Sequence, residues 1–179
     1  MNINQDKTKY KFLEDVAIAD IAYEAYGKDL NELFENAALA IFELSANLET
    51  VDAKKKIEIK LENEKIENLL YDFLSEILFL KDSKYMVFKK MKVSIKETSV
   101  NRKAISAEQS ERKSELSHST AQKSKIFDNK KYQLRAVLEG DTINPQKQQL
   151  ENDIKAVTMH MFEIKKEKKG YKATIVVDI

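Results

Sequence analysis

Two stretches of this sequence carry the apolar repeat of an amphipathic helix, and they limit the fold more than any other feature. Apolar side chains recur at helical spacing over residues 30–48, where Asp29 stands at the N-cap position and Glu32 follows three residues later, a variant of the capping box. The second repeat covers residues 64–80. Each repeat has one broad apolar face. The spacing therefore predicts two helices, each packed by that face on a β-sheet.

The other apolar stretches are short and alternate with polar residues, as β-strands do. Side chains at alternate positions of a strand point to opposite faces, so this pattern predicts strands with one buried face. It occurs before, between and after the helices, at residues 10–15, 18–26, 57–61, 87–96, 132–138, 154–164 and 171–179. The sequence therefore predicts one domain over residues 1–179, of the α+β class, with two amphipathic helices on sheet layers of about seven strands.

One of these strands contains an acid that needs a partner. Within residues 12–27, FLEDVAIADIAYEAYG, an apolar face is formed by Ile21, Tyr23 and Ala25, and Asp20 lies on the opposite face near the strand's start. A half-buried carboxylate requires hydrogen-bond donors, a cation or a metal ion beside it. Backbone amides at a strand end are the commoner answer, so a functional role for Asp20 is a hypothesis at this point.

A second isolated acid follows the last predicted strand. Asp178 comes directly after the apolar run of residues 171–177, and the C-terminal carboxylate of Ile179 lies one residue beyond it. Together with Asp20, these groups offer the hard oxygen ligands that suit Ca²⁺ or Mg²⁺, with waters completing the shell. Nothing local in the sequence says that the two strand ends meet, so a shared metal site is also a hypothesis.

Residues 98–131 differ in composition from the rest of the chain. They are rich in Ser, Lys, Glu, Arg and Gln, contain neither Gly nor Pro, and include only scattered apolar residues. Such a segment buries too little apolar surface to offset its ordering entropy. We therefore predict a polar, mobile insertion in the hairpin of residues 87–96 and 132–138. Its functional interpretation is a basic arm that contacts RNA or a partner protein.

The composition argues against several classes of protein. With 31 basic and 30 acidic residues the formal net charge is +1, so no overall field favours nucleic acid or membrane. The absence of cysteine removes disulfides, thiolate zinc sites and cysteine nucleophiles, and three glycines leave little room for a phosphate-binding loop. No apolar run reaches the ~20 residues of a membrane span. We expect a soluble, cytoplasmic protein with no enzymatic activity of its own.

Several stretches, taken together, resemble one known family. They are FLE followed by ADIAYEAYG, the helix sequences LNELFENAALAIFEL and LLYDFLSEILFL, the late motif KAVTMH and the ending VVDI. Apart from residues 98–131, the chain resembles the archeases, small proteins that activate the RtcB-type tRNA-splicing RNA ligase. The resemblance implies a fold similar to the strand-helix-strand-strand (SHS2) type. It also implies an accessory function: promoting guanylylation of the ligase histidine, speeding turnover and widening nucleotide use, while the ligase holds the manganese and performs the GTP chemistry.

The resemblance implies a site as well. Asp20 matches the family's metal-binding Asp near the N-terminus, and Asp178 and Ile179 match its C-terminal ligands, with calcium as the ion. The family often has His-Thr-Ala-Asp after FLE, whereas residues 15–20 here are Asp-Val-Ala-Ile-Ala-Asp, two residues longer and without the histidine. The implied partners are an RtcB-type ligase and, through it, tRNA.

Two other functions compete with this one. An RNA-binding or chaperone-like module would act on RNA-processing enzymes through the Lys-rich residues 98–131, and salt-sensitive RNA binding that disappears with that segment would identify it. A metal-dependent hydrolase using Asp20 and Asp178 has less support, because no motif supplies a base, nucleophile or oxyanion donors. Of the two histidines, His118 lies in the insertion and His160 is expected in the core or on a sheet face.

Overall fold

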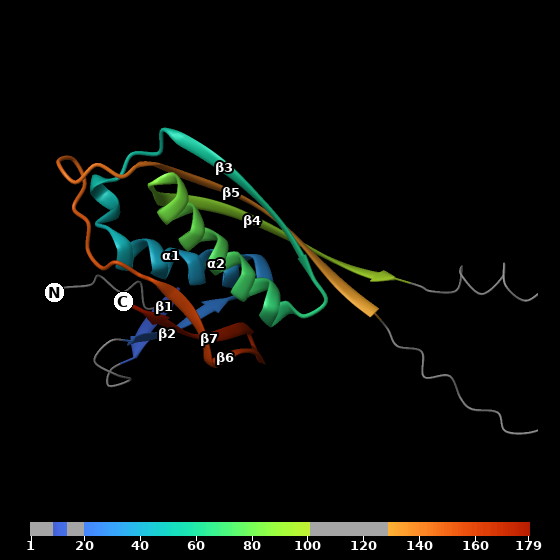
Figure 1. The fold of residues 1–179 in the computed structure, drawn as a ribbon. Coiled ribbons are helices and arrows are strands. Elements are labelled where there is room, and N and C mark those ends of the chain that lie inside the picture. Colours follow the sequence, from blue (N-terminus) through green and yellow to red (C-terminus); the bar gives the residue numbers. More distant parts are fainter. Residues whose placement is uncertain (1–8, 14–19, 101–128) are drawn as a thin grey trace, which may run out of the picture.

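The structure, a computed structural model, describes residues 9–13, 20–100 and 129–179. Within these ranges, seven strands and two α-helices form three layers (Figure 1). One antiparallel sheet has the order β1 (Tyr10–Leu13), β2 (Asp20–Gly27), β7 (Gly170–Asp178) and β6 (Ala156–Glu167), and the other has the order β3 (Lys55–Asn63), β5 (Asn129–Thr142) and β4 (Met86–Val100). The helices α1 (Leu30–Ser45) and α2 (Ile66–Lys84) lie between the sheets. The predicted α+β class, with its helix and strand numbers, is confirmed.

Helix α1 begins where its capping residues predict. The backbone N–H of Glu32 donates to Asp29 Oδ1 at 2.9 Å, and Glu32 Oε2 accepts from the backbone N–H of Lys28 at 2.7 Å. The first bond satisfies one of the N–H groups that a helix start leaves without partners, and the second ties the residue before the N-cap to the first turn. The predicted helix start is confirmed.

The end of α1 differs from the prediction. The helix stops at Ser45, and Leu48–Thr50 form a separate 3₁₀ turn. The backbone N–H groups of Glu151 and Asn152 donate to the carbonyl oxygens of Ser45 and Leu44 at 3.0 and 2.9 Å. Because a distant segment satisfies these helix-end carbonyls, the helix ends one turn before its apolar repeat does.

Burial of α1 is broader than a single face. It contacts β2 of one sheet and β4 of the other, and its buried residues are Leu33, Phe34, Asn36, Ala37, Ala38, Ala40, Ile41, Phe42 and Leu44. The prediction of one face packed on one sheet is therefore wrong for α1. Its run of alanines fits a helix enclosed on two sides, since small side chains allow close approach of the neighbouring layers.

Helix α2 extends a turn beyond its predicted end, to Lys84. Lys81 and Lys84 lie in its last turn, where positive charge interacts favourably with the helix dipole. The helix ends at Tyr85, which has left-handed backbone angles, φ 52° and ψ 49°. Neither of the two helices in the described part of the chain is both long and apolar enough to cross a membrane.

The first sheet packs its inner face on the helices. Tyr23 and Ala25 of β2, and Ala173, Ile175 and Val177 of β7, have no solvent exposure. These are the apolar rows that alternation predicts. The predicted strand residues 14–15 and 18–19 lie outside the described residues.

The β4–β5 hairpin is longer than predicted. Its pairing continues from Met86 opposite Thr142 to Val100 opposite Asn129. Both boundaries of the predicted insertion, residues 98–131, are therefore wrong by three residues, since regular ladder extends into each end. The remaining residues 101–128, and the prediction that they are mobile, lie outside the described residues.

Strand β6 is interrupted where it was predicted to be regular. Between Thr158 and Glu163 its register with β7 shifts, so that residues 159–162 face Ile175 alone. Met161 has a positive φ of 55° within this irregularity. His160 is exposed there, so of its two expected positions, in the core or on a sheet face, the structure shows the second.

Candidate functional site

The two acids singled out by the sequence are paired directly. Asp20, the first residue of β2, is the register partner of Asp178, the last residue of β7. Directly opposed residues of antiparallel strands have Cα atoms about 4.5–5.5 Å apart and side chains on the same face. Both side chains are half-buried. The strand ends that the sequence alone could not connect therefore meet, and they bring two carboxylates together.

A lysine that sequence reasoning missed lies beside this acid pair. The backbone N–H of Lys155 donates to the main-chain oxygen of Asp178 at 2.9 Å, and its Nζ donates to the main-chain oxygen of Ile179 at 3.0 Å. A regular hairpin counted back from the β6–β7 turn would place Met159 opposite Asp178. The irregularity in β6 instead places Ala156 there, which brings Lys155 to the end of β7.

The donor set at this end fits a hard divalent cation in part. Two carboxylates directly opposite each other repel unless a cation compensates them. Asp20 and Asp178 offer carboxylate oxygens and Ile179 a main-chain oxygen, the ligand chemistry that Ca²⁺ prefers, with waters supplying the rest of its six to eight positions. Among the residues that the structure describes, no group of three or more His, Asp or Glu side chains converges. The site therefore rests on the acid pair and not on a larger acidic cage.

A second carboxylate on the same two strands has a different environment. Glu24 of β2 accepts hydrogen bonds from Lys172 Nζ of β7 at 2.7 Å and from the Tyr26 hydroxyl at 2.5 Å. These bonds hold the pKa of Glu24 below its usual value. Burial, together with the bond to Glu24, raises the pKa of Tyr26 to about 12. This cluster is a closed ion pair that stabilises the sheet.

The fold and the acid pair define a class of protein: a small α+β domain with two helices between two antiparallel sheets and a candidate cation site at paired strand ends. A model of the Archease protein family (MTH1598/TM1083) matches residues 10–122 and 108–179. The chain belongs to the archease family.

Curated relatives and solved structures agree with this assignment. An archease of Methanosarcina mazei is 34% identical and covers 96% of either chain, and one of Pyrococcus abyssi is 31% identical over 90% of this chain and 93% of its own. The solution structure of protein 1598 from Methanobacterium thermoautotrophicum has 27% identity and a TM-score of 0.66, covering 96% of this chain and 99% of its own.

A more distant structure supports the fold alone. The crystal structure of an archease from Thermotoga maritima, described as a possible chaperone, has 19% identity and a TM-score of 0.54. It covers 91% of this chain and 93% of its own. The resemblance that the sequence motifs indicated is confirmed at the level of family and fold.

Proposed function

We propose that this chain is a non-catalytic activator of an RtcB-type tRNA-splicing RNA ligase. Membership of the archease family makes this the first function to test. The observation that carries it is the direct pairing of Asp20 with Asp178, the two acids that match the family's metal positions. The chain would promote guanylylation of the ligase, speed its turnover and broaden its nucleotide use. It would reach tRNA only through the ligase.

The residues of this chain would act by holding charge in a fixed place. Asp20 and Asp178 would bind a divalent ion, with Ca²⁺ as the first choice, and Ile179 would add an oxygen ligand. When bound, the ion supplies positive charge for a phosphate or carboxylate of the ligase pocket. Lys155 ties down the end of β7 through its two hydrogen bonds. The β2–β7 ladder fixes the backbone positions of both acids, so such a site would be preformed.

A guanylylation assay tests this function. Purified RtcB-type ligase, GTP and a broken tRNA would be incubated with and without the chain, and covalent ligase–guanylate would be measured over time. We expect faster guanylylation and more rounds of ligation per ligase when the chain is present. An unchanged rate at saturating chain concentration would contradict the proposal.

Matched variants connect this activity to the acid pair. Asp20→Asn and Asp178→Asn remove one charge each at nearly constant shape, and we expect both to abolish activation. Glu163→Gln is the control, because Glu163 lies on the same sheet opposite Thr174 and pairs with Lys165 at 2.5 Å. Full activation by both Asn variants would separate the function from the acid pair.

The second candidate is a chaperone-like function, the alternative that the sequence left open; the Thermotoga archease is itself described as a possible chaperone. A chaperone would increase the yield of active ligase during refolding but would not accelerate guanylylation of ligase that is already folded. Adding the chain after the ligase has folded therefore distinguishes the two. For either function we propose a cytoplasmic setting, because a chain without cysteine cannot form the disulfides that are typical of proteins in oxidising compartments.

A further inference from the structure

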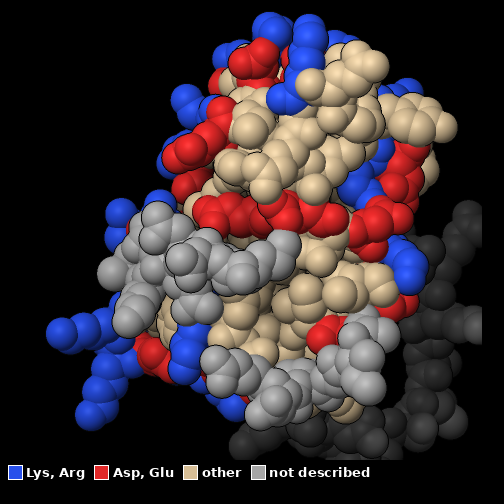
Figure 2. All heavy atoms as spheres, turned by 90° about the vertical axis from the view of Figure 1, so that its left-hand side faces the viewer, with Lys and Arg blue, Asp and Glu red and all other residues tan. Residues whose placement is uncertain are grey.

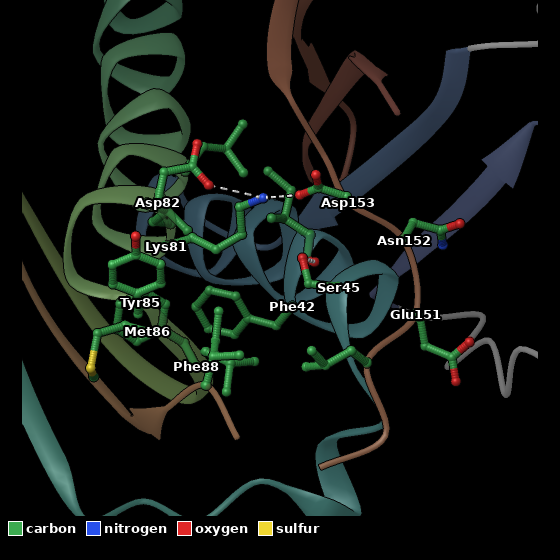
Figure 3. Close-up of a pocket in the computed structure, with 16 residues that line it drawn as sticks. Phe42, Ser45, Lys81, Asp82, Tyr85, Met86, Phe88, Glu151, Asn152 and Asp153 are labelled. Atoms are coloured by element: carbon green, nitrogen blue, oxygen red, sulfur yellow. Dashed lines mark hydrogen bonds and ion pairs between the residues drawn. The ribbon is translucent and has the colours of Figure 1, made fainter. Parts of the chain in front are cut away.

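A cavity of about 320 Å³ opens at the end of the molecule where both helices stop. Figure 3 shows Phe42 of α1 and Phe88 of β4 between its two sides, with Tyr85 and Met86 on one side and Glu151 on the other. The Phe42 and Phe88 ring centroids are 5.6 Å apart. Its size lies within the range of pockets that bind ligands, roughly 300–1,000 Å³. The cavity thus offers an apolar base that is open to solvent.

Tyr85 at the mouth of this cavity occupies an unusual backbone position. Its φ of 52° lies in the left-handed region, where a helix usually ends in glycine because a Cβ is disfavoured. Its side chain is nevertheless 69% exposed, so burial does not explain a large aromatic residue there. A strained position that carries an exposed ring points to a contact made by the ring itself. Leu150, 40% exposed, adds a second apolar group to the cavity lining.

The rim of the cavity is acidic toward solvent. Lys81 Nζ lies 3.1 Å from Asp82 and 2.5 Å from Asp153, and it also donates to the carbonyl oxygen of Ile154 at 3.0 Å. The Lys81 side chain is only 13% exposed, whereas those of Asp82 and Asp153 are 64% and 83% exposed. The single lining cation is therefore largely buried, while its two partners are exposed. Glu151 is half-buried and accepts a hydrogen bond from Gln149 Nε2 at 2.9 Å.

The acidic side chains at this end of the molecule are visible on its surface. Figure 2 shows a band of acidic side chains across this end, between two areas of uncharged residues. The last turn of α1 contains no basic residue to offset the partial negative charge of its helix terminus. An occupant with an apolar centre and positive flanks would match both the base and the rim.

We infer that this cavity docks a basic segment of a partner protein, which inserts one large apolar side chain between Tyr85 and Leu150 and places Lys or Arg against Asp82, Glu151 and Asp153. This goes beyond the proposed function and does not depend on it. The cavity is nonetheless close to the acid pair along the chain, because the wall residue Asp153 is two residues before Lys155, which binds the end of β7.

Short synthetic peptides test this inference. The probes are three amidated peptides, Lys-Arg-Leu-X-Arg-Lys with Phe, Leu or Met at X, and matched peptides in which every basic residue is Glu. Binding to the full chain would be measured by fluorescence anisotropy of a labelled peptide. We expect binding of at least one basic peptide, weakening steeply as salt rises, and no binding of the acidic set.

Variants locate the binding. Two variants should each lower the affinity for the basic peptide about fivefold or more. One is the double variant Asp82→Asn with Glu151→Gln, and the other is Tyr85→Gly. The control is Glu163→Gln with Glu167→Gln, which removes the same charge from the β6–β7 hairpin and should leave the affinity unchanged. Tyr85→Gly suits its backbone angles, so loss of folding does not complicate the result, and unfolding curves of every variant would verify this.

Several outcomes would overturn the inference. These are failure of all three basic peptides to bind at millimolar concentration, equal binding of the acidic peptides, or equal affinity in the cavity and control variants. Self-association of the chain that Tyr85→Gly abolishes would assign the cavity to a second copy and also overturn it. If guanylylation is still stimulated in any of these cases, the proposed function stands and only the docking surface is lost.

Discussion

The β2–β7 strand pair carries opposite arrangements of charge along its length. At one end Asp20 lies opposite Asp178, so two carboxylates face each other. Further along the same strands Glu24 meets the ammonium of Lys172 at 2.7 Å. Glu24 is thus neutralised by a lysine of the neighbouring strand, whereas Asp20 has another acid, Asp178, as its partner across the strands. The difference is the reason why we propose a cation from outside the chain as the partner of the acid pair.

The cavity rim is a third arrangement that sharpens this comparison. There Lys81 lies between Asp82 and Asp153, so two carboxylates share one internal cation. The protein therefore places lysines beside carboxylates where packing requires compensation. At the acid pair the backbone N–H of Lys155 donates to the main-chain oxygen of Asp178, and its ammonium donates to the C-terminal carboxylate of Ile179.

Calcium should produce the largest change in the free energy of unfolding. For the wild type, Ca²⁺ at one hundred times its Kd should raise the free energy of unfolding by about 2.7 kcal/mol. Asp20→Asn and Asp178→Asn should lose this gain and should be at least as stable as the wild type in chelator, because a like-charge repulsion has been removed. Chemical denaturation with Ca²⁺ and with chelator measures both. Equal wild-type stability in the two conditions would contradict the proposal that the acid pair, unlike the ion pairs, depends on a bound cation.

Substitution of Lys81, the lysine at the cavity rim, should have the second-largest effect on stability. Lys81→Met removes a largely buried ammonium that bonds two carboxylates and a carbonyl, and we expect a loss of about 2 kcal/mol in the free energy of unfolding. Lys54→Met is the matched control, since Lys54 and its partner Asp52 have side chains more than 60% exposed (64% and 62%), and it should leave the free energy of unfolding almost unchanged. Equal losses would show that Lys81 is an ordinary surface charge.

The Glu24–Lys172 pair should give a smaller, pH-dependent effect. The folded-state pKa of Glu24 is lowered by its bonds to Lys172 and Tyr26, so its contribution is present above its unfolded pKa near 4.5 and is lost as the pH falls through the folded value. We expect Glu24→Gln to cost about 1 kcal/mol at pH 7 and almost nothing at a pH low enough to protonate Glu24 in the folded state. Denaturation curves across this range measure the cost. A difference that is the same at both pH values would contradict the ion-pair assignment.

Shortening the β4–β5 hairpin should have the smallest effect. Val100 and Asn129 are register partners, so residues 101–128 can be replaced by Asn-Gly as a two-residue turn. Figure 1 places this end of the hairpin on the opposite side of the molecule from the C-terminus. We expect a change of less than ~1 kcal/mol in the free energy of unfolding and unchanged Ca²⁺ binding. A loss of several kcal/mol would show that the segment contributes packed structure.

Local features of the fold were predictable because local residues determine them. The start of α1 depends on Asp29 and Glu32, which lie within one turn of each other. Its end was predicted wrongly because Glu151 and Asn152, distant in sequence, satisfy its last carbonyls. The β4–β5 ladder was underestimated because its last pairs have polar sequences, in which alternation gives no signal.

The two aspartates of the acid pair were predictable as residues, but their pairing was not. Asp20 and Asp178 stand out as isolated acids in apolar strands, yet their contact depends on the β2–β7 register, which is a long-range property. Lys155 escaped notice because the irregularity after Thr158 changes which residue reaches the end of β7. The cavity gave no sequence signal because its lining comes from both helix ends, β4 and residues 150–153.

Calorimetric titration of Ca²⁺ into the chain is the most direct test of the acid pair as a metal site. The comparison requires the wild type, Asp20→Asn, Asp178→Asn and the control Glu163→Gln. We predict binding of one ion by the wild type and by Glu163→Gln, and no measurable binding by either Asp variant. Equal heats of binding in all four proteins, or none in the wild type, would contradict the assignment of the paired strand ends as a cation site.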